Sequence, residues 1–174
     1  SAAAQNVVPC VLELGGKSPN VIFADAPDLE HAAQVAAFGI FRNAGQVCIA
    51  GSRLIVQREI HDDFVKRVVE IAEGMTIGDP LDLATTIGAV HSETQLKSNV
   101  SFVKNAQADG NTVVTGGGRI LAETGGFYMP PTVLTNVGAE DTAAQKEAFG
   151  PILSVTPFDD FDDAVRIANA TNFG

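Results

Sequence analysis

The stretch that decides the fold is residues 20–56, which read NVIFADAPDLEHAAQVAAFGIFRNAGQVCIAGSRLIV. A short run of strand-forming residues at 21–23 is followed by apolar residues that recur at the 3.6-residue period of a helix. Asp28 is placed to cap the start of this helix, and residues 43–45 contain Asn and Gly, which tolerate the left-handed conformation that ends one. A second β-branched run follows at residues 53–56. A strand, a helix and a strand in this order are typical of α/β proteins.

The same alternation continues on both sides of this stretch. We expect further strands at residues 7–14, 112–115, 132–134 and 152–156. Strands separated by helices favour a mostly parallel sheet with helices on both faces, which is the α/β class. Sites in such sheets cluster in loops beyond the carboxyl ends of strands, and the loops at residues 15–20 and 45–52 fit that position.

Three more helices are expected from apolar periodicity and capping residues. One carries Phe64 and Val68 on its apolar face and ends at Gly74. Another opens at Ser92 and Gln95, which have the spacing of a capping box. The last is capped by Asp159 or Asp160, and its expected apolar face consists of Phe161, Ala164, Val165 and Ala168.

The composition excludes several classes of protein. The chain has 174 residues, 45% of them hydrophobic and 18% charged, which is enough to bury the core of one domain. Its net charge of −10 argues against nucleic acid and anionic membrane surfaces as partners. No apolar run approaches the roughly 20 residues of a membrane-spanning helix. Two cysteines without a signal peptide indicate a reducing compartment, so we expect a cytoplasmic protein.

Cys48 is the first candidate for chemistry. It stands among small residues and glycines between a predicted helix end and a predicted strand, where a substrate can approach it. A thiolate is a strong nucleophile once its pKa is lowered. The alternative is a buried, inert cysteine, and position alone leaves both readings open.

Carboxylates near the same predicted loops are the next candidates. Glu13 ends an apolar strand, where desolvation would favour a general base, although a solvent-facing residue or a structural ion pair fits its spacing as well. Glu147 stands beside Phe149, a pair that suits ribose hydroxyls and a ring, or equally a solvated turn with a core aromatic.

Two other kinds of site are excluded by spacing. Gly16 and Lys17 resemble part of a phosphate-binding loop, but Val11 stands where that loop needs Gly, and Pro19 interrupts the helix that should follow. The three histidines have no carboxylate or Cys at metal-ligand spacing, so no metal site is expected.

Three motifs in order resemble the NAD(P)-dependent aldehyde dehydrogenase superfamily. They are residues 12–20 (LELGGKSPN), residues 43–48 (NAGQVC) with 50–53 (AGSR), and residues 147–151 (EAFGP). The resemblance covers essentially the whole chain and implies the catalytic domain of such an enzyme, which oxidises a small aldehyde with NAD or NADP.

The resemblance also implies roles for individual residues. Cys48 would be the nucleophile, with its backbone N–H donating to the oxyanion, and Glu13 would be the general base that favours hydrolysis to a free acid. Glu147 would hold the nicotinamide ribose and Phe149 would pack near the nicotinamide. Gln95, on the adenosine side, and Gly15 would also contact the cofactor, although the capping box explains Gln95 equally well.

The resemblance further implies that residues 1–174 are one domain of a longer enzyme. The start without Met and the stop at Gly174 read as cut ends, with a cofactor domain before Glu13 and a carboxyl-terminal part both absent. We therefore expect the chain alone to bind NAD weakly and to be inactive, and the parent to be a homodimer or homotetramer. A catalytically silent relative with a structural role stays open as the alternative.

Overall fold

A five-stranded sheet forms the centre of the molecule, in a computed structural model that describes residues 2–173. The strand order is β1 (Pro19–Ile22), β2 (Arg53–Gln57), β5 (Ile152–Phe158), β4 (Thr132–Thr135) and β3 (Thr112–Thr115). The first four strands are parallel to one another, and only β3 pairs antiparallel. The predicted α/β class with a mostly parallel sheet is therefore confirmed.

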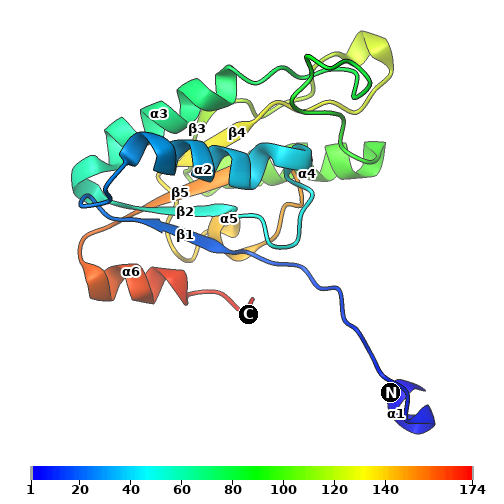
Figure 1. Cartoon of the computed structure of the whole chain (residues 1–174), viewed down its shortest axis with the longest axis horizontal. Coiled ribbons are helices and arrows are strands. Elements are labelled where there is room, and N and C mark those ends of the chain that lie inside the picture. Colours follow the sequence, from blue (N-terminus) through cyan, green and yellow to red (C-terminus); the bar gives the residue numbers. More distant parts are fainter. Residues whose placement is uncertain (1, 174) are drawn as a thin grey trace.

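Helices cover both faces of this sheet (Figure 1). One face carries α2 (Leu29–Phe41) and α3 (His61–Glu73), and the other carries α4 (Glu93–Ala108) and α6 (Phe161–Ala168). The core consists of two hydrophobic clusters, and successive residues of β2 alternate between them. Leu54 and Val56 belong to the larger cluster, while Ile55 packs with residues of α6 in the smaller one. Short helices α1 (Ala2–Asn6) and α5 (Thr142–Gln145) complete the set of α-helices in the described range.

The predicted boundaries of α2 are confirmed at both ends. The Asp28 Oδ1 atom accepts a hydrogen bond of 2.9 Å from the backbone N–H of His31, as a helix N-cap does. The chain then leaves the helix through the short 3-10 turn η1 (Arg42–Gly45), in which Asn43, Ala44 and Gly45 all have positive φ. This turn delivers the chain to the loop that contains Cys48.

The predicted strand at residues 7–14 is wrong. In the described residues this stretch follows α1, pairs with no strand and leads away from the sheet, as Figure 1 shows. Val7 and Val11 are 91% and 86% exposed. Its β-branched and apolar composition satisfies the pattern of a strand, but a strand also needs a partner for its backbone N–H and C=O groups.

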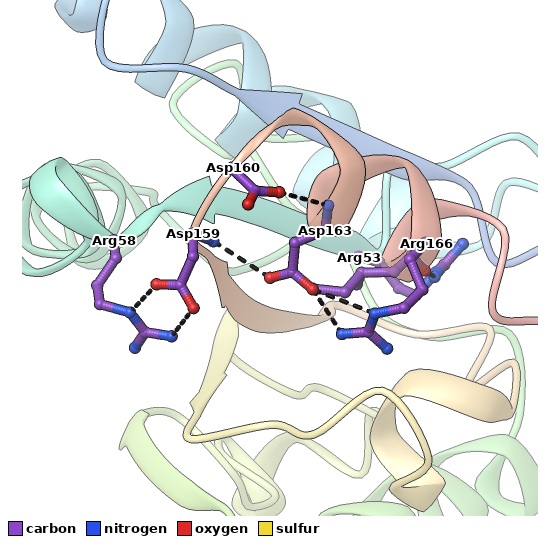
Figure 2. A network of polar contacts seen from close by, with 7 residues as sticks. Arg53, Arg58, Asp159, Asp160, Asp163 and Arg166 are labelled. Atoms are coloured by element: carbon purple, nitrogen blue, oxygen red, sulfur yellow. Dashed lines mark hydrogen bonds and ion pairs between the residues drawn. The ribbon is translucent and has the colours of Figure 1, made fainter.

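Helix α6 begins where expected, but only Ala164 and Ala168 of its expected apolar face pack against the core. Asp160 is the N-cap and accepts from the backbone N–H of Asp163, whereas Asp159 forms an ion pair with Arg58 (Figure 2). Ala164 and Ile167 are buried, while the expected core residues Phe161 and Val165 are exposed. Because Ile167 packs with Ile55 and Phe158, the tertiary contact with β2 and β5 decides the buried face.

Buried Arg53 anchors the end of α6 to the start of β2. Its guanidinium donates to the carbonyl oxygens of Ile167 and Ala168, and its Nε to the carbonyl oxygen of Lys17, each at 2.8 Å. Arg53 thus satisfies carbonyl groups at a helix end and ties the segment before β1 to β2. No helix in residues 2–173 has the length and apolar character needed to cross a bilayer.

Candidate active site

A cavity of about 450 Å³ brings together five of the six predicted site residues. Glu13 and Gly15 come from the segment before β1, Cys48 from the loop before β2, and Glu147 and Phe149 from the loop before β5. The other lining residues are Leu14, Gln46 and Val47. The candidate site is therefore built from three segments that are distant in the sequence.

The site lies at the amino ends of the parallel strands, which is the opposite end of the sheet from the one predicted. All three loops enter parallel strands at their amino ends, so the expected position beyond the carboxyl ends is wrong. For the first loop the reason is the missing strand at residues 7–14, because residues 15–18 lead into β1 instead of following a strand of this sheet. The second loop leads from η1 into β2 and so also precedes a strand.

Backbone and side-chain hydrogen bonds shape the loop around Cys48. Asn43 and Gln46 exchange bonds between their side-chain amides and each other's carbonyl oxygens, and the Ala50 N–H donates to the Val47 carbonyl at 3.0 Å. Cys48 itself is half-buried. Within residues 2–173 its backbone N–H donates to no protein acceptor, so this group is available to a substrate oxygen.

Two glycines let the Glu13 segment cross the other two loops at close range. A Cβ atom at Gly16 would overlap with the carbonyl oxygen of Cys48, and one at Gly15 would overlap with the Glu147 carboxylate. The Gly16 N–H donates to Glu147 Oε1 at 3.1 Å. Gly15 thus has a clear steric role beside the cofactor contact that the resemblance implies.

Glu13 lines the same cavity as Cys48 but is exposed. The expectation that it ends a buried strand and is desolvated is therefore wrong for the described residues. Its segment follows no strand, so nothing in residues 2–173 covers its carboxylate. A cavity shared with Cys48, rather than burial, is what supports Glu13 as a candidate.

Gln95 is the predicted site residue that does not line the cavity. Ser92 Oγ accepts from the Gln95 backbone N–H at 3.2 Å, so Ser92 caps α4 as predicted. The Gln95 side chain does not complete the capping box, because its Nε2 donates to the Ala148 carbonyl and to Asn99 Oδ1. Gln95 therefore contacts the loop of residues 147–149 from α4 and from outside the lining of the cavity.

Sequence reasoning missed a second buried cation close to the site. Lys17 is only 2% exposed, and its Nζ lies 5.4 Å from the centre of the Phe102 ring. Burial, reinforced by the nearby charge of Arg53 and opposed by Glu147, lowers the pKa of Lys17 to about 7. The sequence feature that could have predicted the burial of Lys17 is its position directly after Gly15 and Gly16. The backbone packs so closely there that a side chain has no route to solvent.

A larger hollow of about 560 Å³ lies beside α6 and contains none of the predicted site residues. Its two arginines are already neutralised, Arg58 by Asp159 and Arg166 by Asp163 (Figure 2). Size alone therefore does not identify the functional cavity. Among residues 2–173 no three His, Cys, Asp or Glu side chains are grouped as metal ligands.

Comparison with known proteins identifies the family of the chain. The family model described as "Aldehyde dehydrogenase family" matches residues 1–174. A betaine aldehyde dehydrogenase of Rhizobium leguminosarum bv. trifolii is 45% identical over all of this chain and 36% of that protein. An aminoaldehyde dehydrogenase 2 of Zea mays is 41% identical over 99% of this chain and 34% of that protein.

Solved structures show the same likeness. The aldehyde dehydrogenase KauB of Pseudomonas aeruginosa has a TM-score of 0.96 and 47% identity over 99% of this chain and 35% of that one. An indole-3-acetaldehyde dehydrogenase complexed with NAD+ has a TM-score of 0.95 and 46% identity over the same shares. The chain spans about a third of the length of the relatives it matches. By sequence and by fold, it belongs to the aldehyde dehydrogenase family.

Proposed function

We propose that this chain is the catalytic domain of a longer NAD(P)-dependent aldehyde dehydrogenase, which oxidises an aldehyde to its carboxylic acid. The observation that carries the proposal is the single cavity shared by Cys48, Glu13, Glu147 and Phe149. The relatives are longer than this chain, and a separate cofactor domain would lie in the part of them that this chain does not cover. One solved relative is a complex with NAD+, which favours NAD over NADP.

In the first half of the reaction, Cys48 Sγ attacks the aldehyde carbon and forms a thiohemiacetal. The free backbone N–H of Cys48 donates to the oxygen that becomes negative, and a preorganised donor of this kind stabilises the transition state. Bound NAD(P) supplies the acceptor for the hydride that leaves this carbon. Cys48 then carries the acyl group as a thioester.

In the second half, Glu13 accepts a proton from a water molecule that attacks the thioester carbon. The carbon–sulfur bond breaks, the carboxylic acid is released and the Cys48 thiolate is restored. Glu13 and Cys48 line the same cavity, and the attacking water would occupy that cavity.

Glu147 and Phe149 suit the nicotinamide end of the cofactor. The Gly16 N–H holds Glu147 Oε1, which leaves Oε2 of the same carboxylate to accept from a ribose hydroxyl. Phe149 is 37% exposed at the cavity and offers an apolar surface to a ring. Val47 is the apolar residue beside Cys48 that lines the cavity, whereas Ile49 is 78% exposed and does not.

The test uses the enzyme that carries this chain and measures aldehyde-dependent formation of NADH. We expect Cys48→Ser to abolish activity. Glu13→Gln should still produce one rapid turnover of NADH per site, because acylation needs no base for water, and should then stop at the thioester. Cys10→Ser and Glu123→Gln, which change exposed residues outside the cavity, are the matched controls and should remain active.

A catalytically silent relative is distinguished by the reactivity of its thiols. We expect iodoacetamide to alkylate Cys48, the proposed nucleophile, faster than Cys10 at neutral pH, although Cys10 is the more exposed of the two. Full activity of Cys48→Ser, or slower alkylation of Cys48 than of Cys10, would contradict the proposal.

A further inference from the structure

Helix α4 contacts the loop that carries Glu147 and Phe149 through a side chain that does not line the cavity. The Gln95 Nε2 atom on α4 donates to the carbonyl oxygen of Ala148 at 2.9 Å. Ala148 stands between the two proposed cofactor-binding residues, so this bond acts on the centre of the loop. Gln95 is separated from Ala148 by 53 residues, which makes the contact a tertiary one.

A second amide on the same helix fixes the orientation of Gln95. Asn99 is completely buried one turn further along α4, and its Oδ1 accepts from Gln95 Nε2 at 2.8 Å. The Asn99 side chain also packs against Gly150, where a Cβ atom would overlap with its amide. Gln95 and Asn99 together contact Ala148 and Gly150, the residues on either side of Phe149.

The loop needs such support because its backbone is strained. Phe149 has φ of 51°, in the left-handed region that non-glycine residues seldom adopt. A residue held there is strained, and it persists only where surrounding contacts determine it. The contacts that do so here are Gln95 to Ala148 on one side and Gly16 to Glu147 on the other.

We propose that Gln95 and Asn99 form a clamp that positions Glu147 and Phe149 for the cofactor. In this role Gln95 is a positioning residue that acts through the Ala148 carbonyl, and Asn99 acts through Gln95. The inference rests on the proposed function for the identity of the ligand, but the clamp itself is a property of the protein without cofactor. The two ideas can therefore be tested separately.

The first experiment measures the loop in the enzyme without cofactor. Trypsin cleaves after Lys146, which is exposed at the start of the loop, and cleavage there reports local opening. We expect Gln95→Met, which keeps the length of the side chain but removes its donors, to accelerate this cleavage about three- to tenfold, the equivalent of the lost hydrogen bond to the Ala148 carbonyl. Gln107→Met, on an exposed position of α4, is the matched control and should cleave like the wild type.

The second experiment separates positioning from chemistry. We expect Gln95→Met to raise KM for NAD about three- to tenfold. Hydrolysis of 4-nitrophenyl acetate, which acylates Cys48 without hydride transfer, should change less than about twofold, because the side-chain hydrogen bonds of Gln95 go to Ala148 and Asn99 and not to the Cys48 loop. Gln95→Glu should behave like Gln95→Met, since a carboxylate would face two acceptor oxygens, and it serves if the first variant folds poorly.

Asn99→Ala distinguishes the clamp from a direct contact between Gln95 and the cofactor. Asn99 is completely buried and cannot touch a ligand, yet its loss should change cleavage and KM in the same direction as Gln95→Met. Unchanged cleavage after Lys146 in both variants would overturn the clamp, as would a parallel loss of ester hydrolysis. A wild-type enzyme that forms no NADH from aldehydes would instead contradict the proposed function and leave the cleavage result intact.

Discussion

At the scale of single residues, the site depends on glycines that allow three backbones to approach one another. Gly15 and Gly16 carry the Glu13 segment over the Glu147 carboxylate and the Cys48 carbonyl, where no larger residue fits. The motif at residues 12–20 predicted that this segment is functional. It did not predict the contact between Gly16 and Glu147, because the two residues are 131 positions apart.

Lys17 gives a prediction about pH and stability. Its pKa of about 7 in the folded protein lies below the ordinary value of 10.5, so between these limits the unfolded chain binds more protons than the folded one. The cost of burying the charge is fully present below about pH 7 and is relieved as pH rises from about 7 to 10.5. We expect Lys17→Met to raise the free energy of unfolding at pH 6 by on the order of a few kcal/mol and to flatten its rise above pH 7.

Urea unfolding followed by circular dichroism at several pH values measures this effect. The control is Lys104→Met, at an exposed position of α4, which should keep the pH dependence of the wild type. A Lys17→Met protein whose stability still rises with the wild-type slope between pH 7 and 10 would show that Lys17 is not the group responsible.

At the scale of elements, helix α2 links local sequence signals to the site. Asp28 caps its start, and its other end passes through the positive-φ residues of η1 directly into the Cys48 loop. Both signals are local, because a cap needs three neighbouring residues and a left-handed turn needs only tolerant ones. For this reason the boundaries of α2 were predictable.

We expect Asp28→Ala to lower the free energy of unfolding by about 1 kcal/mol, the typical cost of losing an N-cap. The matched control is Asp25→Ala, which changes a carboxylate that makes no side-chain hydrogen bond in the described structure. Chemical unfolding of the two variants side by side measures the difference. Equal stability of the two would mean that the bond from the His31 N–H contributes nothing.

The segment before β1 shows the limit of reading elements from a pattern. Residues 7–14 have the composition of a strand, but they pair with no strand of the described chain. Helix α6 shows the same limit for a buried face, because Ile167 is buried against the sheet whereas Phe161 is exposed. Residues 7–14 lack a partner strand in the described chain, and contacts with β2 and β5 select the buried face of α6, so neither outcome could be read from the local pattern.

At the scale of the whole molecule, the described chain supplies the nucleophile, the base and the nicotinamide-end residues of the proposed site. The cavity around Cys48 is lined by eight residues, and Glu13 stays exposed at its border. We propose that a separate domain of the longer enzyme supplies most contacts to the dinucleotide. The homodimer or homotetramer implied by the family resemblance stays a prediction, which sedimentation velocity on the enzyme would test.

The corresponding prediction concerns the 174-residue chain alone. We expect isothermal titration calorimetry with NAD to show weak binding or none, because Glu147 and Phe149 contact only the nicotinamide end in the proposed arrangement. Circular dichroism of the same sample would confirm that the chain is folded. A micromolar Kd for the folded chain would refute the division of labour between two domains.

The sequence by itself determined the α/β class, the central helices and strands, and the family, because periodicity, caps and short motifs act over a few neighbouring residues. It also identified Cys48, Glu13, Glu147 and Phe149 as candidates. Only the tertiary structure decided that these residues share one cavity at the amino ends of the strands, that Lys17 and Arg53 are buried, and that Gln95 turns from its own helix end toward Ala148. The physical reason is that burial and hydrogen-bond partners depend on segments up to 131 residues apart, whose approach no local pattern encodes.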